Sequence, residues 1–184
     1  WELPDHVVVP VASGALLTKI AKGFRELADV GLVSTHETVA ISGAQAEGCS
    51  PVATAFEEGT EDVRPQKPST IAKSLAIGDP ADGFYALREV RGSGGAVAAV
   101  SDEETIGAIH LLARTEGIFT EPAGGVTIAT LAKLAREGRI SEKERVVAYV
   151  TGHGLKTPEV MGPDTLEVIP ATVEGFQSMY DTKE

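Results

Sequence analysis

Apolar residues follow two different spacings along the chain, and the two spacings alternate. Short continuous runs rich in β-branched residues predict buried strands, and the first run covers 6–11. Longer segments, in which apolar residues recur every three or four positions, predict helices. The expected strands cover 6–11, 39–43, 96–100, 145–150 and a shorter run near 166–169, and the expected helices cover 15–30, 50–58, 79–90, 102–116, 122–137 and 172–180.

Strands that are apolar throughout are buried on both faces, and strands that alternate with helices are typical of parallel sheets. We therefore expect an α/β fold with three αβα layers around a mostly parallel sheet. The 184 residues contain no internal repeat and suit one domain. Ser101 and Glu104 have the spacing of a capping box at a helix start. In the first expected helix, the apolar residues Leu16, Ile20, Phe24 and Leu27 recur at helical spacing.

Composition narrows the class of protein. Hydrophobic residues make up 42% of the chain and charged residues 23%, as in folded globular proteins, and no apolar run is long enough to cross a membrane. The net charge of −11 and the aromatic content of 5% both disfavour a nucleic-acid partner. The single cysteine, Cys49, excludes an internal disulfide and favours a reducing compartment such as the cytoplasm.

Two other kinds of chemistry find little support in the sequence. The four histidines lack the spacing of metal ligands, and one cysteine cannot build a zinc site, so no metal is expected. A nucleophilic Cys49 would need a histidine beside it, and no local motif indicates one. A small apolar thiol is the simpler interpretation.

The chain opens at Trp1 without an initiator methionine, and an apolar strand is expected soon after it. We interpret the chain as an internal piece of a longer protein whose upstream part is missing. Removal of an N-terminal tag or propeptide is the alternative.

The first candidate site lies at 10–15, where small residues join the first strand to the first helix. Small side chains let a ligand approach the backbone, and a helix N-terminus presents free N–H groups and the positive end of the helix dipole. Together these features favour an anion, most simply a phosphate, to which the Ser13 hydroxyl would add a donor. An ordinary tight turn between strand and helix is the alternative.

Two more junctions are rich in small residues. Glu-Pro-Ala-Gly-Gly at 121–125 reads either as a helix start or as a carboxylate facing a shared pocket. Thr-Gly-His-Gly-Leu-Lys at 151–156 follows the late strand, and its glycines predict a loop that approaches something closely. A flexible exit loop with a solvated histidine is the alternative there.

Together with 9–20, 43–51 and 71–83, these two motifs resemble the threonine synthases, which are fold-type II pyridoxal-phosphate enzymes. The resemblance extends from Pro4 to about Pro158. It implies a lyase that converts O-phosphohomoserine and water into threonine and phosphate with pyridoxal 5'-phosphate as cofactor. In that family a lysine in the N-terminal part holds the coenzyme as a Schiff base, and the motif of that lysine is absent here.

The resemblance therefore implies that 1–184 is the C-terminal part of the large, coenzyme-binding domain, and that no catalytic lysine lies in this chain. Thr151 would hydrogen-bond the pyridine nitrogen, Glu121 would border the ring, and 73–78 would line the cleft. The coenzyme phosphate would be bound by backbone N–H groups of the loop formed by Ala12, Ser13, Gly14, Ala15 and Leu16.

Partners follow from the same resemblance. The whole enzyme would be a cytoplasmic homodimer that binds a phosphorylated amino acid and neither nucleic acid nor membrane. The isolated piece would be inactive, would bind the coenzyme weakly and without a covalent bond at best, and would self-associate through an uncovered sheet edge. The alternatives are a related enzyme such as threonine dehydratase, or a stand-alone binding domain without catalysis.

Overall fold

The structure is a computed structural model that describes residues 2–34, 38–160, 162 and 169–180. Its centre is a parallel sheet of four strands in the order β3-β2-β1-β4. β1 lies inside the sheet, and Val8 is in register with Ser42 on one side and Ala148 on the other. The strands are β1 (His6–Pro10), β2 (Ala40–Ala46), β3 (Val97–Val100) and β4 (Val146–Ala148).

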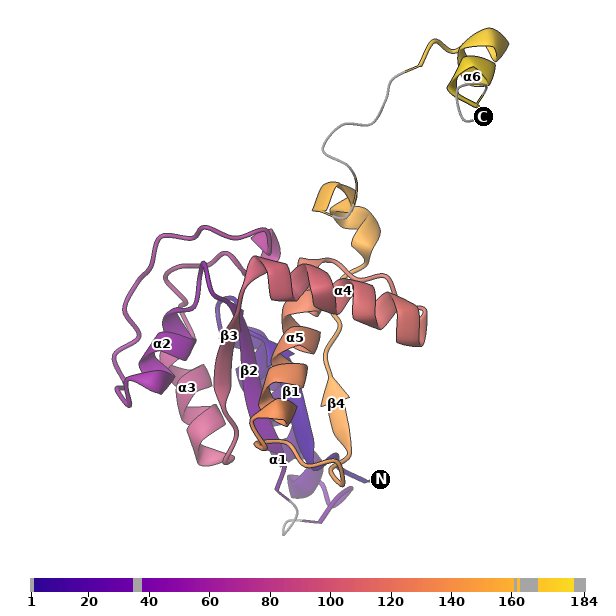
Figure 1. Ribbon diagram of the computed structural model, residues 1–184. Coiled ribbons are helices and arrows are strands. Elements are labelled where there is room, and N and C mark those ends of the chain that lie inside the picture. Colours follow the sequence, from indigo (N-terminus) through magenta and orange to yellow (C-terminus); the bar gives the residue numbers. More distant parts are fainter. Residues whose placement is uncertain (1, 35–37, 161, 163–168, 181–184) are drawn as a thin grey trace.

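Helices cover both faces of the sheet (Figure 1). α1, α2 and α3 pack on one face, whereas α4 and α5 pack on the other. The expected three-layer α/β fold with a parallel sheet is therefore confirmed. The helices are α1 (Ala15–Asp29), α2 (Pro51–Glu57), α3 (Gly83–Gly92), α4 (Asp102–Glu116), α5 (Pro122–Arg136) and α6 (Val173–Tyr180), with short 3-10 helices at Lys73–Leu75, Gly154–Lys156 and Pro158–Val160.

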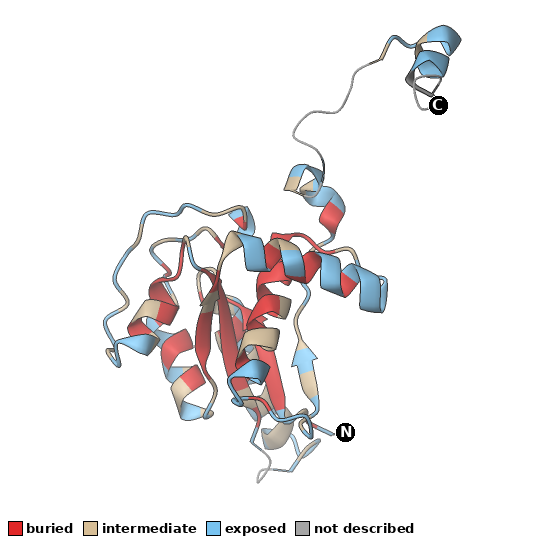
Figure 2. Cartoon of the chain, viewed as in Figure 1, coloured by how far each residue is buried: buried red, intermediate tan, exposed pale blue. Residues whose placement is uncertain are grey.

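Alternation along β1 creates the two cores. Val7 and Val9 belong to the cluster under α1, α2 and α3, and Val8 belongs to the cluster under α4 and α5. All three side chains are fully buried, because successive residues of a strand point to opposite faces and both faces are covered here. In Figure 2, β1 is red throughout and β2 and β3 are mostly red.

The capping box expected at the start of α4 is present. The Ser101 hydroxyl accepts a hydrogen bond from the Glu104 N–H at 3.1 Å, and the Glu104 carboxylate accepts one from the Ser101 N–H at 2.8 Å. Each interaction satisfies an N–H that has no partner in the helix ladder. The local sequence alone therefore determines where this helix begins.

Two details of the core differ from what the pattern of apolar residues predicts. Leu16 is 44% exposed and Leu17 is fully buried, because α1 starts with Leu16 turned away from the core and Leu17 turned into it. The run 145–150 is also not a fully buried strand. Among the described strands β4 pairs only with β1, and Val147 is 42% exposed although Val7, with which it is in register, is fully buried.

At the C-terminal end, the expected helix at 172–180 is present as α6. Most of the strand expected near 166–169 lies outside the described residues. Within the described part of the chain, no helix is both long enough and apolar enough to traverse a lipid bilayer.

Candidate functional site

A pocket of about 210 Å³ lies where β1 and β4 end and α1 and α5 begin, at the upper end of the sheet in Figure 1. We call it the strand-end pocket. Parallel α/β folds bind ligands at this end of the sheet, where helix N-termini converge. Chain segments that are far apart in the sequence meet in its lining. The lining residues are Pro10, Ala12, Ser13, Gly14, Leu16, Ser74, Leu75, Glu121, Ala123 and Thr151.

Most of the residues predicted from the sequence therefore meet in one place. Ala15 is the exception: it begins α1 but does not line the pocket. Within the segment 73–78, the lining residues are Ser74 and Leu75. Pro10 and Ala123 also line the pocket; both lie in the junctions 10–15 and 121–125 that the sequence singled out, although neither was assigned a coenzyme contact.

The loop before α1 is held in place by contacts with Asp82, at the start of α3. Gly14 has φ +95°, and a Cβ there would lie 2.6 Å from the carbonyl oxygen of Asp82, so only glycine fits. The Asp82 N–H donates to the Ser13 carbonyl at 2.8 Å, which fastens the loop to the start of α3. The backbone at 13–14 therefore holds its position without a ligand.

The first turn of α1 offers unused donors. No side chain caps this helix, although the Ala15 N–H makes a long 3.3 Å bond to the Ser13 hydroxyl. Thr18 is the first residue whose N–H reaches back to a carbonyl of the helix start, that of Gly14. The N–H groups of the preceding turn point out of the helix end, where they favour an anion.

Glu121 supplies the charged group of the strand-end pocket. It precedes Pro122, the first residue of α5, and is 5% exposed. Its carboxylate forms an ion pair with the Lys156 ammonium at 2.8 Å, and the Lys156 side chain is 60% exposed. A nearly buried carboxylate is therefore balanced by a cation that approaches from the solvent.

The glycines at 152 and 154 are explained by the segment that precedes α5. A Cβ on Gly152 would lie 1.9 Å from a carboxylate oxygen of Glu121, and a Cβ on Gly154 would lie 2.5 Å from the Phe119 ring. The Gly152 carbonyl accepts hydrogen bonds from the Thr120 hydroxyl at 2.9 Å and the Glu121 N–H at 3.1 Å. The loop at 151–156 therefore does approach something closely, as expected, and what it approaches is the segment of the same chain that contains Phe119 and Glu121.

Thr151 and His153 differ in their surroundings. Thr151 is exposed and lines the strand-end pocket. His153 does not line it: its Nδ1 accepts a hydrogen bond from the Leu155 N–H at 3.1 Å, and its ring packs edge-on against Phe119. Its position between two glycines makes His153 a candidate for the site, but in the structure its ring contacts a neighbouring part of the same loop and Phe119.

The other candidate groups lie elsewhere. Cys49 is fully buried, and burial raises the pKa of its thiol, which keeps it protonated and poorly nucleophilic. His6 is buried in β1 with Nε2 2.7 Å from the Ser42 hydroxyl, and burial lowers its pKa, against a smaller opposing effect of Glu144. Among the residues that the structure describes, no three side chains of the metal-binding types gather.

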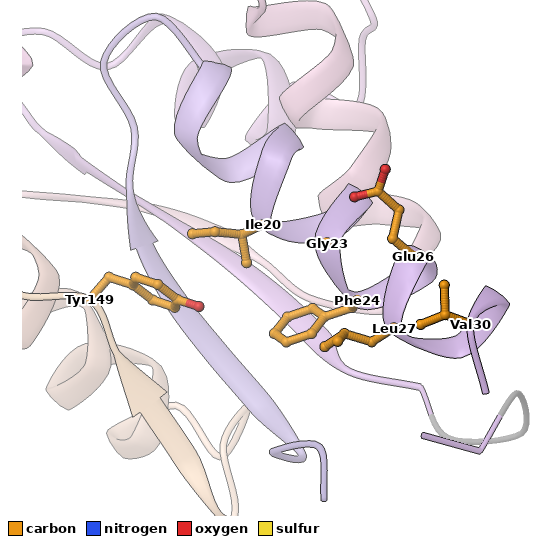
Figure 3. A pocket seen from close by; sticks show the side chains of 7 residues that line it. All are labelled: Ile20, Gly23, Phe24, Glu26, Leu27, Val30 and Tyr149. Carbon is orange, nitrogen blue, oxygen red and sulfur yellow. The ribbon is translucent and has the colours of Figure 1, made fainter. Parts of the chain in front are cut away.

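A larger hollow of about 480 Å³, the α1 groove, lies between α1 and the segment after β4 (Figure 3). Figure 3 shows Ile20, Phe24 and Leu27 of α1 turned toward the same space as Tyr149. Its lining is mostly apolar and lacks converging polar groups. Although it is larger than the strand-end pocket, it offers no comparable chemistry.

A family model described as pyridoxal-phosphate dependent enzyme matches residues 2–152. The chain belongs to this family. The match includes β1, the loop before α1, Glu121 and Thr151, so most of the strand-end pocket falls within it.

Curated members of the family that the chain matches are named threonine synthase. That of Methanocaldococcus jannaschii is 44% identical over 160 residues, which are 86% of this chain and 39% of the relative. That of Methanosarcina acetivorans is 40% identical over 162 residues, covering 88% and 40%, and that of Mycobacterium bovis is 36% identical over 171 residues, covering 93% and 45%. The chain thus spans less than half the length of these curated relatives.

Two solved structures share the fold of this chain. Threonine deaminase isoform 2 from Solanum lycopersicum superposes with a TM-score of 0.67 at 19% identity, over 88% of this chain and 43% of that one. An L-serine ammonia-lyase from Rhizomucor miehei gives a TM-score of 0.65 at 22% identity, over 87% and 50%. These likenesses support the fold-type II assignment of the sheet and its helices.

Proposed function

We propose that residues 1–184 are the C-terminal part of the coenzyme-binding domain of a threonine synthase. The whole enzyme would convert O-phosphohomoserine and water into threonine and phosphate, as a cytoplasmic homodimer. The observation that carries the proposal is the strand-end pocket, where the 12–16 loop, Glu121 and Thr151 meet. The identity of 36–44% to threonine synthases supports the choice of reaction.

The residues of the strand-end pocket fit pyridoxal phosphate. The uncapped first turn of α1 would bind the phosphate through backbone N–H groups, and the small side chains of Ala12, Ser13 and Gly14 leave room for it. The Thr151 hydroxyl would donate a hydrogen bond to the pyridine nitrogen. A neutral hydroxyl leaves that nitrogen unprotonated, whereas a carboxylate would favour its protonation.

When bound, pyridoxal phosphate supplies an electron sink for charge that develops on the substrate carbon atoms. This chain would orient that sink and shield it from water. Leu16, Leu75 and Ala123 give the strand-end pocket apolar walls, and Glu121 would lie beside the ring. Among the described residues, no lysine lines the strand-end pocket, so this part of the chain would hold the coenzyme without a covalent bond.

Leu16 provides a test of the site that spares the fold. Leu16→Asp places a carboxylate at the proposed phosphate position, while an acidic residue in the first turn of a helix favours the helix. We expect equilibrium dialysis to show at least about tenfold weaker pyridoxal phosphate binding than in the unaltered chain. The control is Leu111→Asp, which alters a similarly exposed leucine on α4 outside the strand-end pocket.

Equal affinity of the two leucine variants, or no binding by the unaltered chain, would contradict the proposed coenzyme site. The reaction itself is tested on the whole protein. Release of phosphate from O-phosphohomoserine supports a threonine synthase, whereas release of ammonia from threonine supports the dehydratase alternative.

A further inference from the structure

A phosphate bound in the strand-end pocket would be repelled by the negative charge of the pocket and of the chain. Glu121 is the charged residue of its lining, and it is 5% exposed. The chain as a whole carries a net charge of −11. An anion that enters the pocket therefore approaches a poorly solvated carboxylate inside a negative protein, and both features oppose binding.

Lys156 lies close enough to Glu121 to offset the negative charge of its carboxylate. Its ammonium is 2.8 Å from the Glu121 carboxylate, and it reaches the carboxylate from outside the lining of the strand-end pocket. Among the described residues, Lys156 is the ion-pair partner of Glu121. The pair carries no net charge, so its repulsion of a nearby phosphate is much weaker than that of a carboxylate alone.

The chain before Lys156 is held rigidly against the chain before α5. The Gly152 carbonyl accepts bonds from Thr120 and Glu121, and the Gly154 N–H donates to the Phe119 carbonyl at 3.0 Å. The Lys156 N–H closes the short helix by donating to the His153 carbonyl at 3.1 Å. These bonds hold the backbone from which the Lys156 side chain reaches Glu121.

We infer that Lys156 is a positioning residue whose pairing with Glu121 makes the strand-end pocket selective for the phosphorylated form of the coenzyme. The inference rests on the proposed pyridoxal phosphate site and deepens it. Lys156 does not touch the ligand; it acts through the charge of Glu121. Its removal should therefore weaken binding of an anion and leave binding of an uncharged analogue nearly unchanged.

The test compares pyridoxal phosphate with pyridoxal, which lacks the phosphate, by equilibrium dialysis of this chain. In Lys156→Met we expect pyridoxal phosphate to bind about tenfold more weakly, as expected when one compensating charge is removed at a partly buried site. Pyridoxal binding should change little. Lys156→Arg should restore the ratio of the two affinities, because it keeps the cation.

Two further variants separate charge from structure. Lys156→Met combined with Glu121→Gln should recover the preference for pyridoxal phosphate, because it removes both charges. Lys143→Met is the matched control, since Lys143 is exposed and its removal changes the net charge of the chain equally, away from the strand-end pocket. Thermal unfolding without ligand confirms that each variant is folded, and the double variant should unfold at a higher temperature than Lys156→Met.

The outcomes distinguish the inference from the proposed function. If the unaltered chain prefers pyridoxal phosphate and Lys156→Met behaves like Lys143→Met, the coenzyme site stands and the role of Lys156 is overturned. An equal loss of both ligands in Lys156→Met, without recovery in the double variant, overturns it as well. If the unaltered chain binds neither ligand, the proposed site fails, and the inference fails with it.

Discussion

Gly152 leaves almost no room for a side chain beside the strand-end pocket. A Cβ at this position would meet the Glu121 carboxylate at 1.9 Å, and that carboxylate is held by Lys156. Either the loop after β4 or the carboxylate must move to accommodate a methyl group. Because Thr151 adjoins Gly152, the movement would also displace a lining residue of the pocket.

We therefore predict that Gly152→Ala lowers the free energy of unfolding by roughly 1–3 kcal/mol, the usual cost of overpacking. Urea unfolding followed by circular dichroism measures it. Gly107→Ala is the control, since Gly107 lies in α4 with nothing within 4 Å of its would-be Cβ. Alanine is the better helix former there, so Gly107→Ala should be stabilising by up to about 1 kcal/mol. Similar losses in both variants would argue against the close contact at Gly152.

His6 links stability to pH. Burial lowers its pKa in the folded chain, and its Nδ1 has no hydrogen-bond partner among the described residues. A protonated imidazole needs an acceptor for each of its two N–H groups, so the folded state disfavours the charged form. The unfolded chain titrates at the ordinary histidine value of about 6.5 and takes up its proton at a higher pH than the folded chain.

We predict that the contribution of His6 to stability is fully present above that value and is lost as the pH falls through it toward the lower pKa of the folded state. Urea unfolding at pH 7.5 and pH 5 should show a smaller pH-dependent loss in His6→Val than in the unaltered chain. His110→Val, at an exposed position of α4, is the control. Identical pH dependence in all three proteins would refute the assignment.

At the scale of elements, α4 and α1 differ in how the N–H groups of their first turns are satisfied. α4 begins with a reciprocal capping box, whereas α1 begins after a left-handed glycine and has no side-chain cap. The Ser101 and Glu104 N–H groups at the start of α4 are satisfied by side chains, whereas at the start of α1, among the described residues, only the Ala15 N–H makes a long bond to a side chain. Within the described part of the chain, the starts of α2, α3 and α5 also lack a side-chain cap, so α4 is the exception among α1 to α5.

We predict that Ser101→Ala costs about 1 kcal/mol of stability, because the Glu104 N–H loses its acceptor. Ser101→Asp keeps an acceptor at the same position and should cost much less. Chemical denaturation of the two variants measures the difference. A loss in Ser101→Asp as large as that in Ser101→Ala would mean that the hydrogen bond of the cap contributes nothing.

The elements themselves could be predicted from the sequence, but the exposure of some of their apolar residues could not. Period and capping are local properties, so α4 and its cap were predicted correctly. The exposure of Val147 depends on which strands flank β4, and that is a property of the whole sheet rather than of the run 145–150. Leu16 and Leu17 are adjacent leucines, and only packing against β1 and α3 decides which of them faces the core.

For the candidate site, too, some features could be predicted from the sequence and others could not. The small-residue junctions and their places at strand ends could be located from the sequence, because parallel strands end at one edge of a sheet. The ion pair between Glu121 and Lys156, and the contact of Gly152 with that carboxylate, could not be predicted. They join segments about thirty residues apart whose approach depends on the packing of the loop after β4 against the chain before α5.

At the scale of the whole molecule, the two outer strands of the described sheet differ. Beside β3, the Lys133 ammonium donates to the Ala99 carbonyl at 2.9 Å, which occupies an edge acceptor. β4 instead presents Val147, and the apolar α1 groove lies beside the segment that follows it (Figure 3). A charged group on a sheet edge discourages further pairing, and an open apolar edge promotes it.

We therefore expect a second copy of this chain to pair along β4. Sedimentation velocity over a wide concentration range should show reversible association that Val147→Lys weakens. Leu111→Lys, which places the same charge on an exposed leucine of α4, should leave the association unchanged. A monomer at every concentration, or equal effects of the two lysine variants, would contradict this expectation.

The most direct test of the central claim is an NMR titration of the isotope-labelled chain with pyridoxal phosphate. If the coenzyme phosphate binds at the start of α1, the amide signals that shift should be those of 12–17, together with Glu121, Ala123 and Thr151. Inorganic phosphate should shift the 12–17 subset alone. Shifts centred on the α1 groove near Phe24 and Tyr149, or no saturable shift at all, would contradict the claim that this chain carries the phosphate site of a pyridoxal-phosphate enzyme.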